Sequence, residues 1–234
     1  MEDYYISPEE MEHYKREGYV FLHNVMKPEE LEELRDRVDG LLEGRYDSTG
    51  FKAGVGSKNA ENDPGKHIKQ VSKLIKPILD PVFRKYSEHP VLLSIVRQLM
   101  EAHDCEVFQM QALVKEPGLP NATPWHQDEF YWKKGGQRVT AWFPLEPLTP
   151  DNGTMSLFPG SHLGQVYYHD RAEGVSDFFT FKEKLDESKA LPIIIPLGSV
   201  SFHHQRMIHG AFPNIGKTRR IAVAQHYLEI KQEV

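Results

Sequence analysis

His126 and Asp128 stand two residues apart in the segment PWHQDEFYW. In an extended strand, side chains two residues apart point to the same face, so this imidazole and this carboxylate can reach one metal ion. A His-x-Asp pair alone is a weak signal, because so short a motif often occurs by chance. The pair therefore predicts a metal site only if a third ligand lies elsewhere in the chain.

The third candidate ligand is His209, far downstream in the segment RMIHGAFPN, at the end of a β-like run. Two histidines and one carboxylate can hold iron(II) on one side and leave coordination positions open for other ligands. His203 and His204 lie close by in the segment SFHH, and a different register would make one of them the ligand instead. Because histidine binds a metal as the neutral imidazole, we expect the affinity for iron to fall as the pH drops through about 6.5.

Arg220 begins the segment RIAVAQHY, eleven residues after His209. A guanidinium can hold a carboxylate through two parallel hydrogen bonds, which a lysine cannot reproduce. The competing candidate is its neighbour, Arg219. On an alternating strand, Arg220 shares a face with Ala222 and Ala224, whose small side chains would let a long arginine cross the interior of a barrel. Arg219 shares the face of bulkier residues, which we expect to pack under helices, so Arg220 is the predicted carboxylate-binding residue.

The elements that would position these residues change in character along the chain. The first part carries helix signals, with capping residues, prolines at the first helical positions and apolar residues at helical spacing. From about residue 106, short apolar runs alternate with Pro, Gly and Asn, which predicts the strands of a β-sandwich or barrel. Helices are expected at 8–17, 28–42 and 89–100, a strand at 19–25 and a long loop at 46–64. We expect one domain over residues 1–234, with a helical part at about 1–105 and a β core at about 106–234.

Composition and charge exclude several classes of protein. Of the 234 residues, 39% are hydrophobic and 26% charged, which is typical of a globular rather than a disordered chain. The net charge of −6 argues against a nucleic-acid partner, which would require a basic face. Cys105 is the only cysteine, so an intramolecular disulfide is impossible and a reducing compartment is expected. With no signal-peptide pattern and no apolar run of bilayer length, we predict a cytoplasmic protein without a membrane partner.

The motifs occur in an order that resembles the phytanoyl-CoA dioxygenase family of non-haem iron(II)- and 2-oxoglutarate-dependent oxygenases. The resemblance spans nearly the whole chain, from EEMEHYKREGYVFLHNV through WHQDEFYW and NGTMSLFPGSH to the last histidine and arginine of the series. It implies a mainly β fold with flanking helices around a double-stranded β-helix (jelly-roll, cupin-like) core. It also implies that iron(II), Fe(2+), is bound by His126, Asp128 and His209. Arg220 would then bind the C5 carboxylate of 2-oxoglutarate, with O2 as the other co-substrate.

The resemblance places three further residues beside 2-oxoglutarate. Trp142, in the segment TAWFPL, matches a family tryptophan that lines the co-substrate pocket. Gln111 falls where the family has a contact from the preceding strand. Lys69, in the segment HIKQVSK, aligns with a lysine that contacts 2-oxoglutarate in some members.

The reaction implied is hydroxylation of a small-molecule substrate with release of succinate and CO2. The carboxylate of Asp128 favours hydroxylation over chlorination, because related halogenases lack it and leave that position to a halide. Desaturation, cyclisation and epimerisation stay open, since the ligands do not encode where the substrate reacts. We expect a small metabolite or a natural-product intermediate rather than an acyl-CoA, because the chain leaves little room for a deep acyl-CoA site.

Two other functions would use the same ligands. One is a cupin-like metal-binding protein without oxygenase activity, and the other is a metal-dependent isomerase or hydrolase that uses the metal as a Lewis acid. Arg220 discriminates against both, since neither needs a buried clamp for a dicarboxylate. The aromatic residues beside the His-x-Asp pair are expected to divide between core and substrate wall; they are Trp125, Phe130, Tyr131 and Trp132. The sequence assigns neither the substrate nor the oligomeric state.

Overall fold

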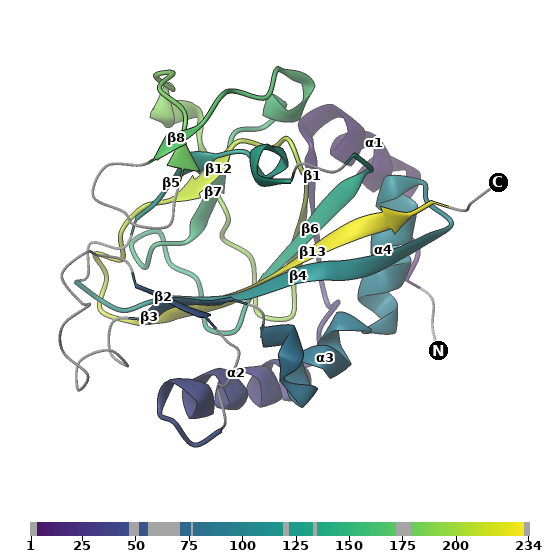
Figure 1. Cartoon of the computed structure of the whole chain (residues 1–234). Coiled ribbons are helices and arrows are strands. Elements are labelled where there is room, and N and C mark those ends of the chain that lie inside the picture. Colours follow the sequence, from purple (N-terminus) through teal and green to yellow (C-terminus); the bar gives the residue numbers. More distant parts are fainter. Residues whose placement is uncertain are drawn as a thin grey trace.

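Two antiparallel sheets face each other in the β-rich part of the chain, and the helices gather on the outer side of the larger sheet (Figure 1). The computed structural model describes residues 4–46, 52–55, 71–75, 77–118, 122–132, 135–171 and 179–231. The larger sheet has the strand order β1-β11-β6-β13-β4-β3-β2, and the smaller one has the order β10-β7-β12-β5. This arrangement confirms the predicted mainly β fold with flanking helices.

The strand bounds show that the larger sheet carries the long strands. Its members are β1 (Tyr19–Leu22), β2 (Lys52–Val55), β3 (Val71–Ile75), β4 (Asp104–Lys115), β6 (Arg138–Pro144), β11 (Val200–His204) and β13 (Arg220–Ile230). The smaller sheet consists of β5 (Thr123–His126), β7 (Met155–Leu157), β10 (Leu191–Pro192) and β12 (His209–Ala211). A separate ribbon pairs β8 (Asp170–Arg171) with β9 (Phe179–Thr180). Short 3-10 turns are η3 (Pro77–Leu79), η4 (Asp128–Tyr131), η5 (Ser161–Leu163) and η6 (Glu187–Lys189).

Helix α1 (Pro8–Glu17) shows how local sequence sets the helix ends. Ser7 and Glu10 form a reciprocal capping box, in which each side chain accepts a hydrogen bond from the other residue's backbone N–H. The helix stops at Gly18, whose φ of 80° is a left-handed conformation that glycine adopts without strain. The predicted helix over 8–17 is confirmed.

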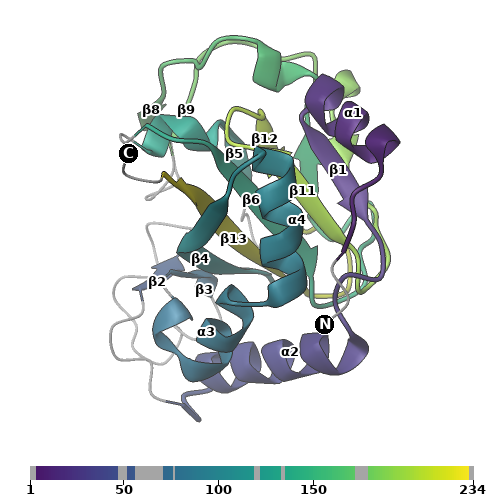
Figure 2. The ribbon, with the colours of Figure 1, turned by 90° about the vertical axis from the view of Figure 1, so that its right-hand side faces the viewer.

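The other helices are α2 (Pro28–Leu42), α3 (Pro81–Ser87) and α4 (Pro90–Met100), and each begins with a proline. Proline suits the first helical position, because its missing N–H would have no partner there in any case. Figure 2 shows α4 lying across the face of the larger sheet, where it contacts β4, β6 and β13. Within the described ranges, no helix has both the length and the apolar character that a bilayer crossing requires.

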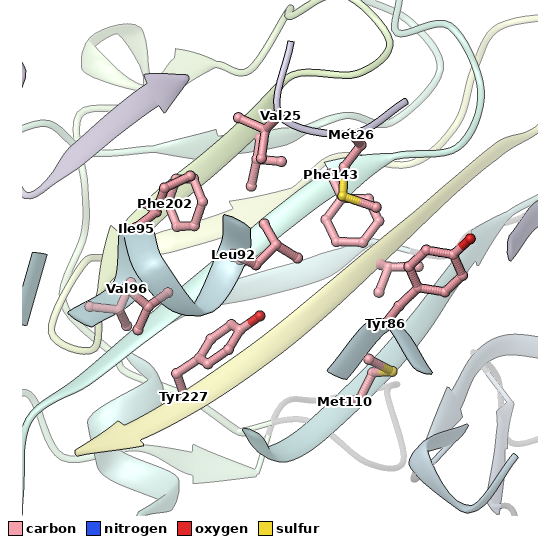
Figure 3. Packing of buried hydrophobic residues seen from close by; sticks show 14 of the residues in the cluster. Val25, Met26, Tyr86, Leu92, Ile95, Val96, Met110, Phe143, Phe202 and Tyr227 are labelled. Carbon is pink, nitrogen blue, oxygen red and sulfur yellow. The ribbon is translucent and has the colours of Figure 1, made fainter. Parts of the chain in front are cut away.

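The main hydrophobic core lies between the helices and the larger sheet (Figure 3). Leu92, Ile95 and Val96 of α4 are fully buried against the sheet, where they meet Phe202 and Tyr227. Burial of one such aliphatic side chain stabilises the fold by about 1.5–3 kcal/mol. A second cluster fills the space between the two sheets; it includes Trp142, Met155, Leu157, Ile193, Ile195, Met207, Ala222 and Ala224.

Two predictions about element bounds need correction. The predicted strand at 19–25 ends at Leu22, because the chain then turns through Asn24, whose φ is 55°. The loop predicted at 46–64 contains strand β2, which pairs with β3, so tertiary pairing overrides its weak strand pattern. The remainder of that segment, from 47 to 51 and from 56 onward, lies outside the described residues.

Candidate metal centre

The structure brings the three predicted metal-binding residues to one point at the edge of the smaller sheet. His126 is the last residue of β5, and His209 is the first residue of β12. The sequence pattern predicted Asp128 on the same strand as His126, but in the structure Asp128 is the first residue of the turn η4. Because Gln127 between them is extended, with φ −122° and ψ 128°, the imidazole and the carboxylate still point to the same side.

Strand register joins the two histidines. His209 and His126 are direct partners in the antiparallel pairing of β12 with β5, and their ring centroids lie 4.1 Å apart. The Nε2 atom of each histidine lies 3.8 Å from Oδ1 of Asp128. One potential ligand atom from each of the three buried side chains lies within 4.8 Å of the other two. Such a cluster can hold one metal ion from one side.

Gly210 allows β12 to come this close to β5. A Cβ atom at this position would lie 2.8 Å from Cε3 of Trp125 and 2.9 Å from the carbonyl oxygen of Thr123. Both distances are shorter than normal carbon contacts, so any side chain here would push the strands apart. The glycine that follows His209 is therefore part of what places His209 beside His126.

Backbone carbonyls fix the orientation of both rings. Nδ1 of His126 lies 2.8 Å from the carbonyl oxygen of Pro124, and Nδ1 of His209 lies 3.0 Å from that of Met207. A carbonyl can only accept a hydrogen bond, so each Nδ1 carries the proton. Nε2 of each ring then presents its lone pair to the side where Asp128 lies, which is the arrangement that metal ligation requires.

Burial and charge keep these groups in metal-binding forms. Burial, followed by the charge of His209, lowers the pKa of His126 to about 3. Burial alone would raise the pKa of Asp128, but the surrounding histidines outweigh it and lower the pKa. At neutral pH the His126 imidazole is neutral and the Asp128 carboxylate is charged. A proton therefore competes at His126 only well below the pH of about 6.5 expected from the sequence, because burial and the neighbouring His209 make a charged imidazolium costly there.

A hydrogen-bonded chain supports Asp128 from the larger sheet. Thr140 on β6 donates through Oγ1 to Oδ2 of Asp128 at 3.2 Å, since a carboxylate can only accept. The same Oγ1 lies 2.8 Å from Nδ1 of His226 on β13, which must then be the donor. Sequence reasoning missed Thr140 and this role of His226, although strand alternation places His226 on the same face as Arg220.

The alternative histidine ligands occupy other positions. Nε2 of His203 lies 4.0 Å from Oδ2 of Asp128, but His203 does not join the cluster whose ligand atoms all lie within 4.8 Å of one another. Nδ1 of His204 accepts a hydrogen bond from the backbone N–H of Arg206, and its ring packs against His162. In the described part of the chain, the predicted set of three is the one group with this geometry.

Arg220 and Arg219 point to opposite sides of β13, as predicted. Arg220 is 2% exposed, and it donates to the carbonyl oxygens of Gly153 and Leu113 inside the barrel. Arg219 instead bridges Asp39 of α2 at 2.6 Å and Glu146 at 2.7 Å on the helical side. Of the two arginines, only Arg220 is therefore placed to reach a molecule bound between the two sheets.

Two of the three softer predictions lie on the same face of the larger sheet as Arg220. The ring centroid of Trp142 lies 5.9 Å from the guanidinium carbon of Arg220, and Trp142 is 1% exposed. Gln111 on β4 pairs with Ala224, which pairs on its other side with Trp142, so both face the barrel interior. Lys69 lies outside the described residues.

Several buried polar atoms between Arg220 and the His–Asp–His cluster have no hydrogen-bond partner in the described structure. They are Oγ of Ser201, Nε1 of Trp142, both ring nitrogens of His203 and Nε2 of His226. Cross-strand register places them in two neighbouring rows, Ser201 beside Trp142, and His203 and His226 on either side of Thr140. An unsatisfied buried polar group costs about 1–3 kcal/mol, so this concentration indicates the place of a polar ligand. A dicarboxylate such as 2-oxoglutarate fits the orphaned N–H of Trp142, the hydroxyl of Ser201 and the buried guanidinium of Arg220.

Comparison with known proteins decides the family. The family model for phytanoyl-CoA dioxygenase (PhyH) matches residues 14–222. The chain belongs to the phytanoyl-CoA dioxygenase family. A probable phytanoyl-CoA dioxygenase from Caenorhabditis elegans is 25% identical over 237 residues, covering 95% of this chain and 75% of the relative.

Solved structures of other oxygenases share the fold. SnoK, a non-haem alpha-ketoglutarate-dependent carbocyclase from nogalamycin biosynthesis, is 25% identical with a TM-score of 0.71, over 96% of this chain and 84% of SnoK. EctD from S. alaskensis, solved with 2-oxoglutarate and 5-hydroxyectoine, is 19% identical with a TM-score of 0.73, over 96% of this chain and 77% of EctD. The predicted double-stranded β-helix is confirmed.

Membership of the phytanoyl-CoA dioxygenase family sets the type of chemistry. The chain is a non-haem dioxygenase that depends on iron(II) and 2-oxoglutarate and uses O2. This membership favours the oxygenase over the two alternatives raised by the sequence, a metal-binding protein without activity and an isomerase or hydrolase.

Proposed function

We propose that this phytanoyl-CoA dioxygenase family member hydroxylates a small metabolite or a natural-product intermediate, with His126, Asp128 and His209 as its iron(II) ligands. The observation that carries the ligand assignment is the position of one Asp128 oxygen, 3.8 Å from Nε2 of each histidine. The overall reaction converts a substrate C–H bond, O2 and 2-oxoglutarate into a C–OH bond, succinate and CO2.

The three ligands divide the work of holding the metal. His126 and His209 offer Nε2 while their Nδ1 protons stay on backbone carbonyls, so neither ring can rotate without losing a hydrogen bond. Asp128 supplies the negative charge, and Thr140 holds its second oxygen. When bound, iron(II) would supply the activation of O2 that is coupled to oxidative decarboxylation of 2-oxoglutarate.

In the proposed co-substrate site, Arg220 binds the distal carboxylate of 2-oxoglutarate. Burial makes this interaction strong, because a charge-assisted hydrogen bond gains in a site from which water is excluded. The Nε1–H group of Trp142 would donate to the same molecule, and Gln111 on β4 would line the same site. Lys69 stays a candidate contact on the strength of the family resemblance alone.

Aromatic side chains surround the metal centre on the side of η4, which supports a small organic substrate. The ring of Tyr131, which is 37% exposed, lies edge-on to His126 with centroids 5.9 Å apart. Trp132 packs against His226 with centroids 5.2 Å apart, and Phe130 stacks on His169 at 4.4 Å. Substrate would approach the ligands past these rings, as the sequence predicted for part of the aromatic group.

Two further proposals concern the domain organisation and the cellular location of the protein. A single domain over residues 1–234 is supported by one hydrophobic cluster that combines residues of the helical part, such as Leu34 and Leu92, with residues of the β core, such as Val223. A cytoplasmic location is supported by Cys105, which is free and buried and thus suits a reducing compartment.

The decisive experiment adds iron(II) and then 2-oxoglutarate to the metal-free protein without oxygen. The expected result is a weak visible charge-transfer band, which His209→Ala abolishes and His103→Ala, a change at an exposed histidine, leaves intact. After admission of O2, release of succinate is measured across a panel of lipids, amino acids, sugars and natural-product precursors. A wild-type protein that gives no band, or the same succinate release with every compound as with none, contradicts the proposal.

A further inference from the structure

A second buried basic side chain, that of Lys115, lies beside Arg220. Lys115 is the last residue of β4, and it is the direct cross-strand partner of Arg220 in the pairing of β4 with β13. Directly opposite residues on antiparallel strands point to the same face of the sheet. Lys115 is 4% exposed and Arg220 is 2% exposed, so both positive groups are removed from water.

Both side chains donate hydrogen bonds to neutral backbone oxygens. Nζ of Lys115 donates to the carbonyl oxygens of Phe212 at 2.7 Å and Ala211 at 3.2 Å. Arg220 likewise donates to backbone carbonyls, those of Gly153 and Leu113. Within the described residues, neither cation has a carboxylate within ion-pair distance. Glu146 favours the charged form of Arg220 from farther away, but Glu146 is itself bound by Arg219.

Gly153 shows that the two side chains converge. Its carbonyl oxygen accepts from Nε and Nη2 of Arg220, while a Cβ atom on the glycine would lie 2.8 Å from Cδ of Lys115. Its φ of +72° also disfavours other residues. The turn before β7 therefore passes against both long side chains at a position where a larger residue would displace the lysine.

If both side chains carried their charge, they would repel each other unless an anion joined them. We propose that Lys115 is the second cation of the co-substrate site and, together with Arg220, binds the distal carboxylate of 2-oxoglutarate. This inference rests on the proposed function, in which 2-oxoglutarate lies between the metal ligands and Arg220. It goes beyond that function in assigning a residue that selects a dicarboxylate over a simple 2-oxo acid.

The protonation of Lys115 follows from the same contacts. Burial, and then the charge of Arg220, lowers the pKa of Lys115 to about 6, so the amine is mostly neutral at pH 7.5 in the free protein. A neutral amine has two N–H groups, and the carbonyls of Ala211 and Phe212 occupy both. The third N–H of the ammonium form would be available to a carboxylate. Binding of the distal carboxylate therefore draws a proton onto Lys115.

The rival interpretation is that Lys115 merely caps the two carbonyls at the end of β12. That role needs no charge and no ligand, so it predicts the same behaviour toward every 2-oxo acid. Binding of 2-oxoglutarate and of 2-oxobutyrate distinguishes the two interpretations. The second acid chelates a metal in the same way as the first but lacks the distal carboxylate.

The test titrates the anaerobic iron(II) protein with each oxo acid and follows the visible charge-transfer band. Calorimetry in buffers of different ionisation enthalpy counts the protons taken up on binding. For the wild type near pH 7.5 we expect close to one proton per 2-oxoglutarate in excess of that for 2-oxobutyrate. Lys115→Gln should raise the Kd for 2-oxoglutarate about tenfold or more, abolish this excess and leave the Kd for 2-oxobutyrate within about twofold.

Two control variants sharpen the result. Lys115→Arg keeps a permanent charge, so it should retain most of the affinity for 2-oxoglutarate without the proton uptake. Glu116→Gln changes the next residue, whose carboxylate lies in the field of Arg219 and Glu146 on the other side of the strand, and should behave as wild type.

The following outcomes would overturn the inference. An equal rise in Kd for both oxo acids in Lys115→Gln, or proton uptake that persists in this variant, assigns Lys115 to the structural role alone. If Lys115→Gln does not fold, equal proton uptake by the wild type with the two oxo acids rejects the proposal. A wild-type protein with no band for either oxo acid contradicts the proposed function itself, whereas a Lys115→Gln variant that prefers 2-oxoglutarate to 2-oxobutyrate as strongly as the wild type contradicts only the role of Lys115.

Discussion

His126 and His209 face each other across the β5–β12 pairing, and each ring is held by a carbonyl two residues earlier in its own strand segment. The two halves of the site are therefore built alike, from a histidine whose Nδ1 bonds to the backbone at position i−2. Asp128 completes the site from the turn that follows β5. The geometry of the proposed metal site thus depends on the register of two short strands.

Replacement of Asp128 by asparagine tests the charge of the site. Asp128→Asn keeps the size of the side chain but removes the negative charge and one of the two carboxylate oxygens. We expect the Kd for iron(II) to rise by more than about 100-fold, since changes outside the ligand set already cost 10–100-fold. Asp104→Asn, at an exposed aspartate, is the matched control. Equal iron(II) affinity in the two variants, measured by equilibrium titration, would remove Asp128 from the ligand set.

Thr140 is predicted to act through Asp128. Thr140→Val is nearly isosteric but loses the hydrogen bonds to Asp128 and His226, so we expect iron(II) binding to weaken by about 10–100-fold. Thr140→Ser retains the hydroxyl and should restore most of the affinity. If Thr140→Val binds iron(II) as the wild type does, the hydroxyl has no part in orienting the carboxylate.

Arg219 and Arg220 form a natural pair for a charge test. Arg220→Met should raise the Kd for 2-oxoglutarate by about 100-fold or more, because the distal carboxylate would be left buried without its main partner. Arg219→Met should leave that Kd unchanged and instead lower the free energy of unfolding by about 1 kcal/mol, through loss of the partly exposed pairs with Asp39 and Glu146. A raised Kd for 2-oxoglutarate in Arg219→Met but not in Arg220→Met would show that β13 presents its other face to the co-substrate.

Gly210 is predicted to be intolerant of a side chain. Gly210→Ala places a methyl group against Trp125 and the backbone of Thr123, and we expect a loss of about 1–3 kcal/mol of stability together with weaker iron(II) binding. Gly135→Ala is the control, since a Cβ atom there meets nothing within 4 Å. Thermal unfolding and metal titration of both variants check this. Identical behaviour would mean that β12 can move away from β5 without harm to the site.

The buried histidines predict how the metal-free protein responds to acid. Burial lowers the pKa of His126 to about 3 and also lowers the pKa values of His203 and His226 below their usual 6.5. Below pH 6.5 these histidines therefore bind protons in the unfolded chain but stay neutral in the folded protein. Stability falls as the pH drops, by up to about 1.4 kcal/mol per pH unit for each such histidine. Asp128, whose pKa is lowered, loses its contribution only below about pH 3.8, outside this window.

Urea unfolding of the metal-free protein at pH 7.5 and at pH 5 measures this effect. We expect a clearly lower midpoint at pH 5, and a smaller pH dependence in His203→Leu, which removes one buried imidazole. Equal midpoints at the two pH values would show that these rings already accept protons in the folded state.

Much of the fold follows from local sequence, because the signals involved act over a few residues. The helix at 8–17 follows from Ser7, Glu10 and Gly18, and the helix at 89–100 from its apolar face. Alternation along β13 separated Arg220 from Arg219 correctly, since an extended strand offers only two faces. Strand β2 was missed because its pairing with β3, rather than its own composition, makes it a strand.

The sequence by itself determined which residue types could hold a metal and a dicarboxylate, and it set the order in which they occur. Only the tertiary structure decided that His209 rather than His203 meets His126, because β12, which carries His209, pairs with β5, whereas β11, which carries His203, pairs with β1 and β6 in the other sheet. It also revealed Thr140 and Lys115, whose positions beside Asp128 and Arg220 depend on cross-strand pairing between distant segments. Contacts of that kind come from the way two sheets close around a common interior, and a one-dimensional pattern does not carry that information.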